Sequence, residues 1–142
     1  SEKYKERRKE YNLKNGWKDR YRSCLKLVIT RLSLKKENKT SVLLGYSDMD
    51  FKLHIESKFT ENMSWEKRDS FEIDHIIPLI AFKEGTPMNI INSLDNLQPM
   101  DPRENLNKFI SIDYNFVDLY VKYLDYLVDE YRNKILEYIN AK

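Results

Sequence analysis

The chain has little cysteine, glycine or proline, and it has no long apolar run. A single cysteine, Cys24, stands among 142 residues. It can form neither an internal disulfide nor a cysteine-based zinc site, so we expect a small buried apolar residue. No apolar stretch approaches the roughly 20 residues that cross a bilayer, and none of the secretory kind stands near the first residue. We therefore expect a soluble, intracellular (cytoplasmic) protein without a membrane partner.

The charge of the chain is small in total but unevenly placed. The formal net charge is +2, and the content of 41% hydrophobic and 13% aromatic residues suits one globular domain with an attached arm. Residues 1–40 hold 14 Lys and Arg against 5 Asp and Glu, whereas the remainder holds 11 against 18. Such a basic segment predicts a phosphate-binding arm, because Lys and Arg release counterions from a polyanion. The alternative is a solvated helix with a basic face.

The first 35 residues are predicted to form two helices. Residues 1–15 are charged and lack an apolar stripe, which indicates an exposed helix, and Asn15-Gly16 is expected to end it. Apolar residues then recur every three or four positions over about 18–35: Trp17, Tyr21, Cys24, Leu25, Val28 and Leu32. The basic side chains off that face, Lys18, Arg20 and Arg22, are predicted DNA contacts.

A further helix is predicted over about 48–59. Ser47 and Asp50 have the spacing of an N-cap pair, and Phe51, Ile55 and Phe59 share one side. His54 lies at the edge of that apolar side. We interpret it as a hydrogen-bonded structural histidine rather than as a metal ligand or base.

Residues 71–110 indicate the order strand, loop, strand, helix. Residues 71–77 are β-branched and aromatic, and Pro78 ends the predicted strand because proline cannot donate to a ladder. After a long excursion, residues 96–100 are expected to pair back as an antiparallel ribbon. Asp101-Pro102-Arg103-Glu104 is a strong helix start, with Asp as cap and Pro at the first helical position. That helix, over 101–110, would carry Asn105 and Lys108 one turn apart.

The segment from about 113 to 140 has an apolar and tyrosine-rich helical spacing, which predicts one long helix or two. We expect its apolar stripe to pack against the helix of residues 18–35. A homodimer interface through this C-terminal helix, or an aromatic surface for DNA, are the alternatives.

Three fragments carry the chemistry: residues 72–78 (EIDHIIP), 96–100 (NLQPM) and 105–108 (NLNK). Asn96 follows His75 by 21 residues, Asn105 follows Asn96 by nine, and Lys108 follows Asn105 by three. Together these fragments resemble the motif of the HNH, or ββα-metal, endonucleases. Residues 44–47, 52–56 and 63–66 are similar to the segment that precedes the motif in phage-type members, and residues 5–11 are similar to their basic arms. The resemblance covers roughly residues 5–110 and has no counterpart for the tyrosine-rich segment.

The resemblance implies an α+β, mainly helical fold, with a hairpin-helix motif flanked by helices. Hydrolysis of a phosphodiester needs a base near neutral pH, for which histidine is suited, and we assign that role to His75. Asp74 and Asn105 offer oxygen ligands for one Mg²⁺ or Mn²⁺. The middle asparagine of the family braces the loop that bears the histidine, which implies this role for Asn96.

Other residues near the motif are weaker candidates. Lys108 and Arg103 are candidate phosphate contacts, with a solvated helix charge as the alternative. Glu72 would share a strand face with Asp74 and is therefore a candidate to orient a ligand or to lie near the metal. Many family members hold a structural zinc with paired cysteines, but Asp101 and Glu104 stand at those places here, so no structural zinc is expected.

The predicted organisation is a basic arm over 1–40, a nuclease core over 41–110 and a helical segment over 111–142 that packs on the core. The expected activity is metal-dependent cleavage of double-stranded DNA to 5′-phosphate and 3′-hydroxyl ends, in a phage or bacterial host. A non-catalytic DNA-binding module and an assembly component of a phage or defence complex are the alternatives.

Overall fold

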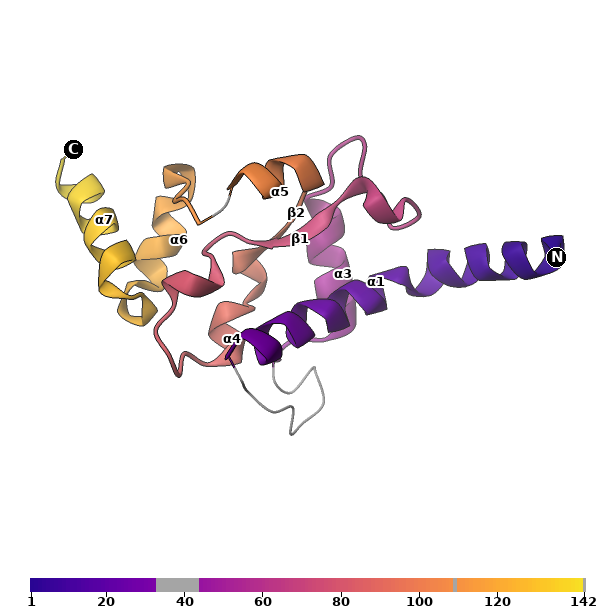
Figure 1. Cartoon of the computed structure of the whole chain (residues 1–142), viewed down its shortest axis with the longest axis horizontal. Helices are drawn as coiled ribbons and strands as arrows, with labels where there is room; N and C mark the ends of the chain where they lie inside the picture. Colours follow the sequence, from indigo (N-terminus) through magenta and orange to yellow (C-terminus); the bar gives the residue numbers. More distant parts are fainter. Residues whose placement is uncertain (33–43, 109, 142) are drawn as a thin grey trace.

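The computed structural model describes residues 1–32, 44–108 and 110–141, apart from the side chains of residues 12, 27–32 and 68. It is a mainly helical α+β structure with one two-stranded antiparallel hairpin in the described part of the chain (Figure 1). The helices are α1 (Glu2–Leu32), α3 (Asp48–Ser57), α4 (Met88–Ile91), α5 (Pro102–Lys108), α6 (Val117–Lys122) and α7 (Asp129–Asn140). The strands are β1 (Glu72–His75) and β2 (Leu97–Met100), and short 3₁₀ turns connect several elements.

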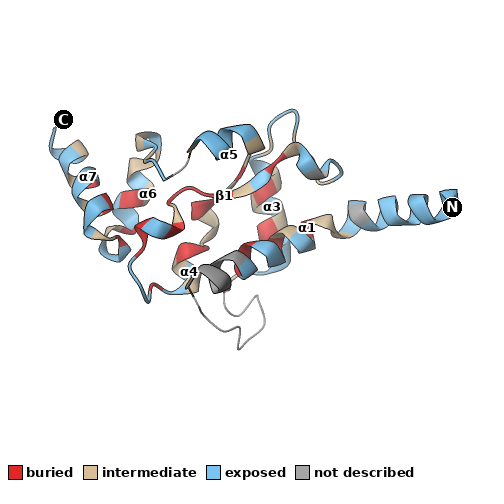
Figure 2. Ribbon diagram, in the orientation of Figure 1, coloured by how far each residue is buried: buried red, intermediate tan, exposed pale blue. Residues whose placement is uncertain are grey.

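Helix α1 is continuous from Glu2 to Leu32, so the predicted break at Asn15-Gly16 is wrong. A glycine inside a helix costs about 1 kcal/mol relative to alanine, which weakens a helix without ending it. The indole of Trp17 donates to the Lys14 carbonyl at 2.8 Å, and Trp17 itself is buried just beyond the glycine. The described side chains of the first 14 residues are exposed, and this half of α1 extends away from the rest of the chain (Figures 1 and 2).

Helix α3 begins as predicted, with a reciprocal cap. The Ser47 hydroxyl accepts from the Asp50 amide, and the Asp50 carboxylate accepts from the Ser47 amide, both at 3.1 Å. Its apolar side packs with the second half of α1, the start of β1 and Leu97 in a core cluster of buried residues: Tyr21, Cys24, Leu25, Leu44, Phe51, Ile55, Phe71 and Leu97. His54 is half-buried and lies 2.8 Å from the Leu97 carbonyl, which confirms a structural hydrogen bond.

The predicted antiparallel ribbon is confirmed. Glu72 faces Met100, Asp74 faces Gln98 and His75 faces Leu97 across the two strands. Helix α5 then begins where the sequence predicts, with the Asp101 carboxylate accepting from the Arg103 amide at 2.8 Å. Helix α5 contacts β1, and it lies on the other side of the hairpin from α1 and α4 (Figure 1).

The C-terminal segment forms two helices, and the packing expected against residues 18–35 is not found for the described side chains of residues 18–26, which belong to the cluster with α3. Its tyrosines and leucines instead bury the excursion between the strands, in a cluster of buried residues: Ile77, Leu79, Ala81, Phe82, Ile91, Tyr120, Tyr123, Leu127, Tyr131 and Ile135. A short backbone pairing of Phe82 with Leu127 adds hydrogen bonds to this contact. The segment thus packs on residues that were assigned to the core. The boundary predicted at residue 40 lies outside the described residues.

Asp95 links the segment between the two strands to α6 through its side-chain contacts. Its carboxylate accepts from the Ser93 hydroxyl at 2.6 Å and the Tyr123 hydroxyl at 2.8 Å, and it forms an ion pair with Lys122. Burial alone would raise the pKa of Asp95. The hydrogen bonds and the Lys122 charge more than offset this effect and lower the pKa below its ordinary value of 3.8.

This lowered pKa predicts an acid-sensitive contribution to stability. The unfolded chain binds the proton more tightly than the folded chain does, so the contribution is complete above about pH 4 and declines as the pH falls through the lower folded pKa. We expect Asp95→Asn to lower the free energy of unfolding at pH 7 by about 1 kcal/mol, because Lys122 is exposed and solvent screens the pair. Urea unfolding at pH 7 and pH 3 measures the effect. An equal difference in the free energy of unfolding between wild type and variant at the two pH values would contradict this prediction.

No helix within the described ranges 1–32, 44–108 and 110–141 is long and apolar enough to span a bilayer.

Candidate functional site

Four polar side chains meet between α5 and the face of the hairpin that lies against it, two from β1 and two from α5. Glu72 and Asp74 are two residues apart on β1 and therefore point to the same side. Asn105 and Lys108 stand three residues apart on α5, so they share one side of that helix. Each α5 side chain pairs with one carboxylate. The sequence pattern brings these four residues together as predicted.

Asp74 is the most enclosed of the four. Its side chain is 7% exposed and accepts from the Lys108 amine, at 2.8 Å to one oxygen and 3.0 Å to the other. The Gln98 amide, which lies opposite on β2, donates to the same carboxylate at 2.9 Å. Lys108 also donates to the His75 and Ile76 carbonyls. Lys108 is thus bonded within the protein here, and its phosphate contact stays a prediction.

Asn105 pairs with Glu72 rather than with Asp74. Its amide nitrogen donates to the Glu72 carboxylate at 2.7 Å. Both residues lie nearer to solvent than Asp74 does. The two predicted metal ligands, Asp74 and Asn105, thus lie on facing elements. Asp74 is bonded to Lys108 and Gln98, whereas Asn105 is bonded to Glu72.

The side chain of His75 points to the other side of the hairpin, because neighbouring residues on a strand alternate. Its Nε2 lies 2.7 Å from the Asn92 side-chain oxygen and 3.9 Å from the Cys24 sulfur of α1, and the residue is 8% exposed. These contacts hold the imidazole between α1 and the residue that follows α4.

Cys24 is confirmed as a buried residue. It donates to the same Asn92 oxygen at 3.3 Å. Burial raises the pKa of its thiol to about 12, so the thiol stays protonated near neutral pH and is not a nucleophile.

Asn96 is fully buried just before β2, and its side-chain hydrogen bonds to the described residues all go to backbone groups. Its side-chain oxygen accepts from the Ile77 amide at 2.7 Å. Its nitrogen donates to the Ile77 carbonyl at 3.2 Å and to the Ile91 carbonyl at 2.9 Å. Asn96 therefore fixes the chain just after His75 and joins it to α4, which is the bracing geometry that the resemblance implies.

The donor chemistry of the α5 face fits a hard divalent cation. Two carboxylates, Glu72 and Asp74, and one amide, Asn105, supply oxygen donors of the kind that Mg²⁺ and Mn²⁺ prefer. Among the described residues no three His, Cys, Asp or Glu side chains cluster tightly enough for a metal ion held by those residue types alone. Such a site would depend on the amide, on water and on substrate phosphate for its remaining ligands.

The predicted DNA contacts differ in how freely they face solvent. Arg22 and Arg103 are exposed. Lys18 is half-buried beside the Trp17 ring. Arg20 donates to the Phe71 carbonyl at 2.7 Å and lies over the Phe71 ring, so it joins α1 to the start of β1.

Sequence reasoning missed Asn92 and Gln98. Gln98 could have been found from the register, since it lies opposite Asp74 once the strands pair. Asn92 had no signal, because it follows a short helix within the excursion and reaches His75 only through the tertiary fold.

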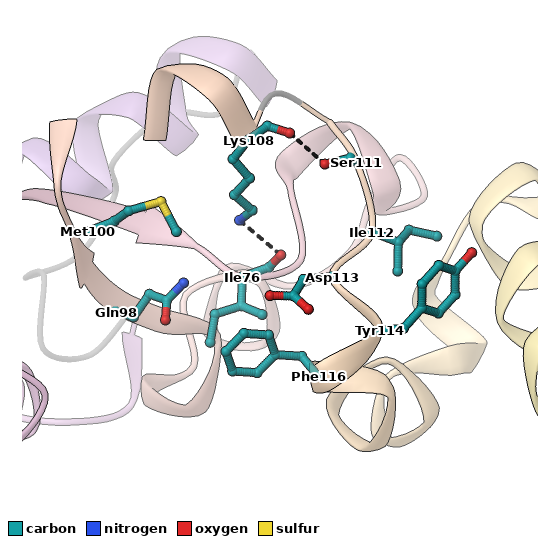
Figure 3. A pocket seen from close by; sticks show the side chains of 9 residues that line it. All are labelled: Ile76, Gln98, Met100, Lys108, Ser111, Ile112, Asp113, Tyr114 and Phe116. Atoms are coloured by element: carbon teal, nitrogen blue, oxygen red, sulfur yellow. Dashed lines mark hydrogen bonds between the residues drawn. The ribbon is translucent and has the colours of Figure 1, made fainter. Parts of the chain in front are cut away.

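A pocket of about 400 Å³ adjoins the α5 face (Figure 3). Lys108 runs along it toward the Ile76 carbonyl, and Gln98, Asp113 and Phe116 contribute to its lining. The segment after α5 thus forms one wall of the site, although the motif ends at Lys108.

No protein-family model and no solved structure matches the chain. The chain is 35% identical over 98 residues to the uncharacterized protein L426 of Acanthamoeba polyphaga mimivirus. The matched part is 68% of this chain but 42% of the mimivirus protein, so the chain spans less than half of that relative.

Proposed function

We propose that the chain is a metal-dependent endonuclease of the HNH type, which hydrolyses DNA phosphodiester bonds to 5′-phosphate and 3′-hydroxyl ends. The observation that carries this proposal is the pairing of two carboxylates on β1 with Asn105 and Lys108 on α5, across a hairpin braced by Asn96. This arrangement brings oxygen donors and a cationic side chain together between the hairpin and α5. Such groups are what phosphodiester hydrolysis requires.

The side chains have separate roles in this proposal. Asp74 and Asn105 would hold one Mg²⁺ or Mn²⁺, with Glu72 beside them. That cation would polarise the scissile phosphate and stabilise the leaving 3′ oxygen. His75 would be the general base that accepts the proton of the attacking water, and this role requires its ring to reach the α5 side of the hairpin from its place beside Asn92. Asn96 acts through the backbone by holding the chain that follows His75.

A plasmid assay tests the proposal. Purified protein with Mg²⁺ or Mn²⁺ is expected to convert supercoiled DNA to nicked or linear product, and a chelator is expected to stop the conversion. The new ends should be ligatable, as 5′-phosphate and 3′-hydroxyl ends are. Asp74→Asn should remove the activity, whereas Asp118→Asn, at an exposed position on α6, should not. Cleavage that persists in chelator would contradict the metal dependence.

A non-catalytic DNA-binding module is the second candidate. The burial of His75 between Asn92 and Cys24, on the side away from α5, favours it. Six Lys and Arg stand in residues 1–15, so the exposed half of α1 offers positive charge to a phosphate backbone. Salt-sensitive DNA binding with no cleavage under any divalent metal would support this candidate and contradict the endonuclease.

A further inference from the structure

We propose that Lys108 is an internal cation that occupies Asp74 in the free protein and must leave that carboxylate before a divalent cation binds. The inference rests on the proposed function, because it concerns the same carboxylate. It adds a regulation of the site: Lys108 makes metal binding weak until a competing anion draws the lysine away.

The surroundings of the Lys108 amine resemble those of a bound cation. Its Nζ lies 2.8 and 3.0 Å from the two Asp74 oxygens, 2.6 Å from the His75 carbonyl and 3.1 Å from the Ile76 carbonyl. An ammonium has three N–H groups, and here four oxygens surround it. Carboxylate and carbonyl oxygens are also the donors that a hard divalent cation takes.

The ion pair between Lys108 and Asp74 opposes the binding of a metal ion, because the lysine is positively charged and already occupies the carboxylate. Both Asp74 oxygens are bonded to Lys108, and the side chains of the pair are only 7% and 12% exposed. A divalent ion at this carboxylate would lie close to the ammonium, in a region where solvent screens repulsion weakly. The Gln98 amide bonds the same carboxylate but carries no charge, so it does not repel a metal ion.

The structure leaves space into which the Lys108 side chain can move. The 400 Å³ pocket runs beside its side chain, and the flexible four-carbon stem can turn into that space (Figure 3). The Asp113 carboxylate lines the same pocket and could receive the amine, and so could a phosphate of bound DNA. A phosphate that takes the lysine would free Asp74 for the metal. Metal and DNA would then bind with positive coupling.

Titration with Mn²⁺ in the absence of DNA tests the competition. Free Mn²⁺ is followed by its electron paramagnetic resonance signal for the wild type, Lys108→Met and Lys122→Met. Lys122 is a matched control, since it also pairs with an aspartate but lies away from Asp74. We expect Lys108→Met to bind Mn²⁺ about tenfold more tightly than the wild type, within the usual range of coupling between sites. Equal or weaker binding by this variant would overturn the proposal.

A second measurement uses the wild type, because removal of Lys108 leaves a buried carboxylate without its cation and can unfold the chain. An amine-reactive acylating reagent is applied with and without saturating Mn²⁺, and modification of each lysine is read by mass spectrometry. Lys108 should become several-fold more reactive with Mn²⁺, while Lys122 should not change. Equal protection of Lys108 in both conditions would overturn the inference. Neither measurement depends on DNA cleavage. A protein that binds Mn²⁺ in this manner without cutting DNA would therefore contradict only the proposed function, and not the competition at Asp74.

Discussion

Replacement of His75 by alanine is expected to lower the rate of plasmid cleavage by roughly 10²–10⁴-fold, the usual contribution of a general base. The imidazole is the proton acceptor in the proposed reaction, and no other described side chain at the hairpin offers a base suited to neutral pH. DNA binding should be largely unchanged, because phosphate contacts come from other residues. Cleavage rates and DNA affinities of the two proteins measure the two effects separately.

The other histidine supplies the control. His54 contacts the Leu97 carbonyl from α3 and takes no part in the proposed chemistry. His54→Ala should therefore cleave at a rate near that of the wild type once the folded fraction is accounted for. A His75→Ala protein that remains active, or a His54→Ala protein that is folded but inactive, would refute the assignment of the base.

Asn96→Ala is expected to destabilise the fold strongly. The change leaves the Ile77 amide, the Ile77 carbonyl and the Ile91 carbonyl without their partner in a fully buried position. Each unsatisfied buried group costs roughly 1–3 kcal/mol, so we expect a loss of about 3–5 kcal/mol in the free energy of unfolding. Urea unfolding followed by circular dichroism measures this loss.

An asparagine on the surface provides the comparison for Asn96. Asn107 is exposed on α5, and Asn107→Ala should change the free energy of unfolding by no more than about 0.5 kcal/mol. Similar small losses for both variants would mean that the hairpin does not depend on the Asn96 brace.

The local order of the hairpin and α5 could be predicted because short-range signals agree there. The strand composition, Pro78, and the Asp101-Pro102 helix start each act within a few residues, and the structure has the elements at those places. The same holds for the Ser47 and Asp50 cap of α3. The meeting of Glu72, Asp74, Asn105 and Lys108 follows from these elements together with the strand and helix periods.

The packing partners of these elements could not be predicted from local signals. The apolar stripe of α6 and α7 needed a partner, but its spacing does not specify which one, and residues 77–91 cover it instead of α1. Gly16 predicts a helix end from its sequence alone, yet α1 continues through it, and Trp17 and Tyr21 beyond it are buried in the fold. The contact of His75 with Asn92 likewise depends on how the excursion folds back.

The partners within the site were the least predictable part. Asp74 and Asn105 were expected to share one cation, and the structure gives each of them an internal partner, Lys108 and Glu72. Spacing identifies which side chains share a face, whereas the choice among neighbouring hydrogen-bond partners depends on differences of a few ångströms that sequence does not encode locally.

The location of bound Mn²⁺ tests the central claim most directly. Crystals of the protein with Mn²⁺ and a DNA duplex, measured for the anomalous scattering of manganese, would place the ion. We expect a peak between the Asp74 carboxylate and the Asn105 amide oxygen, next to a DNA phosphate. A manganese ion bound elsewhere on the chain, with Lys108 still on Asp74 in a complex that cuts DNA, would contradict it.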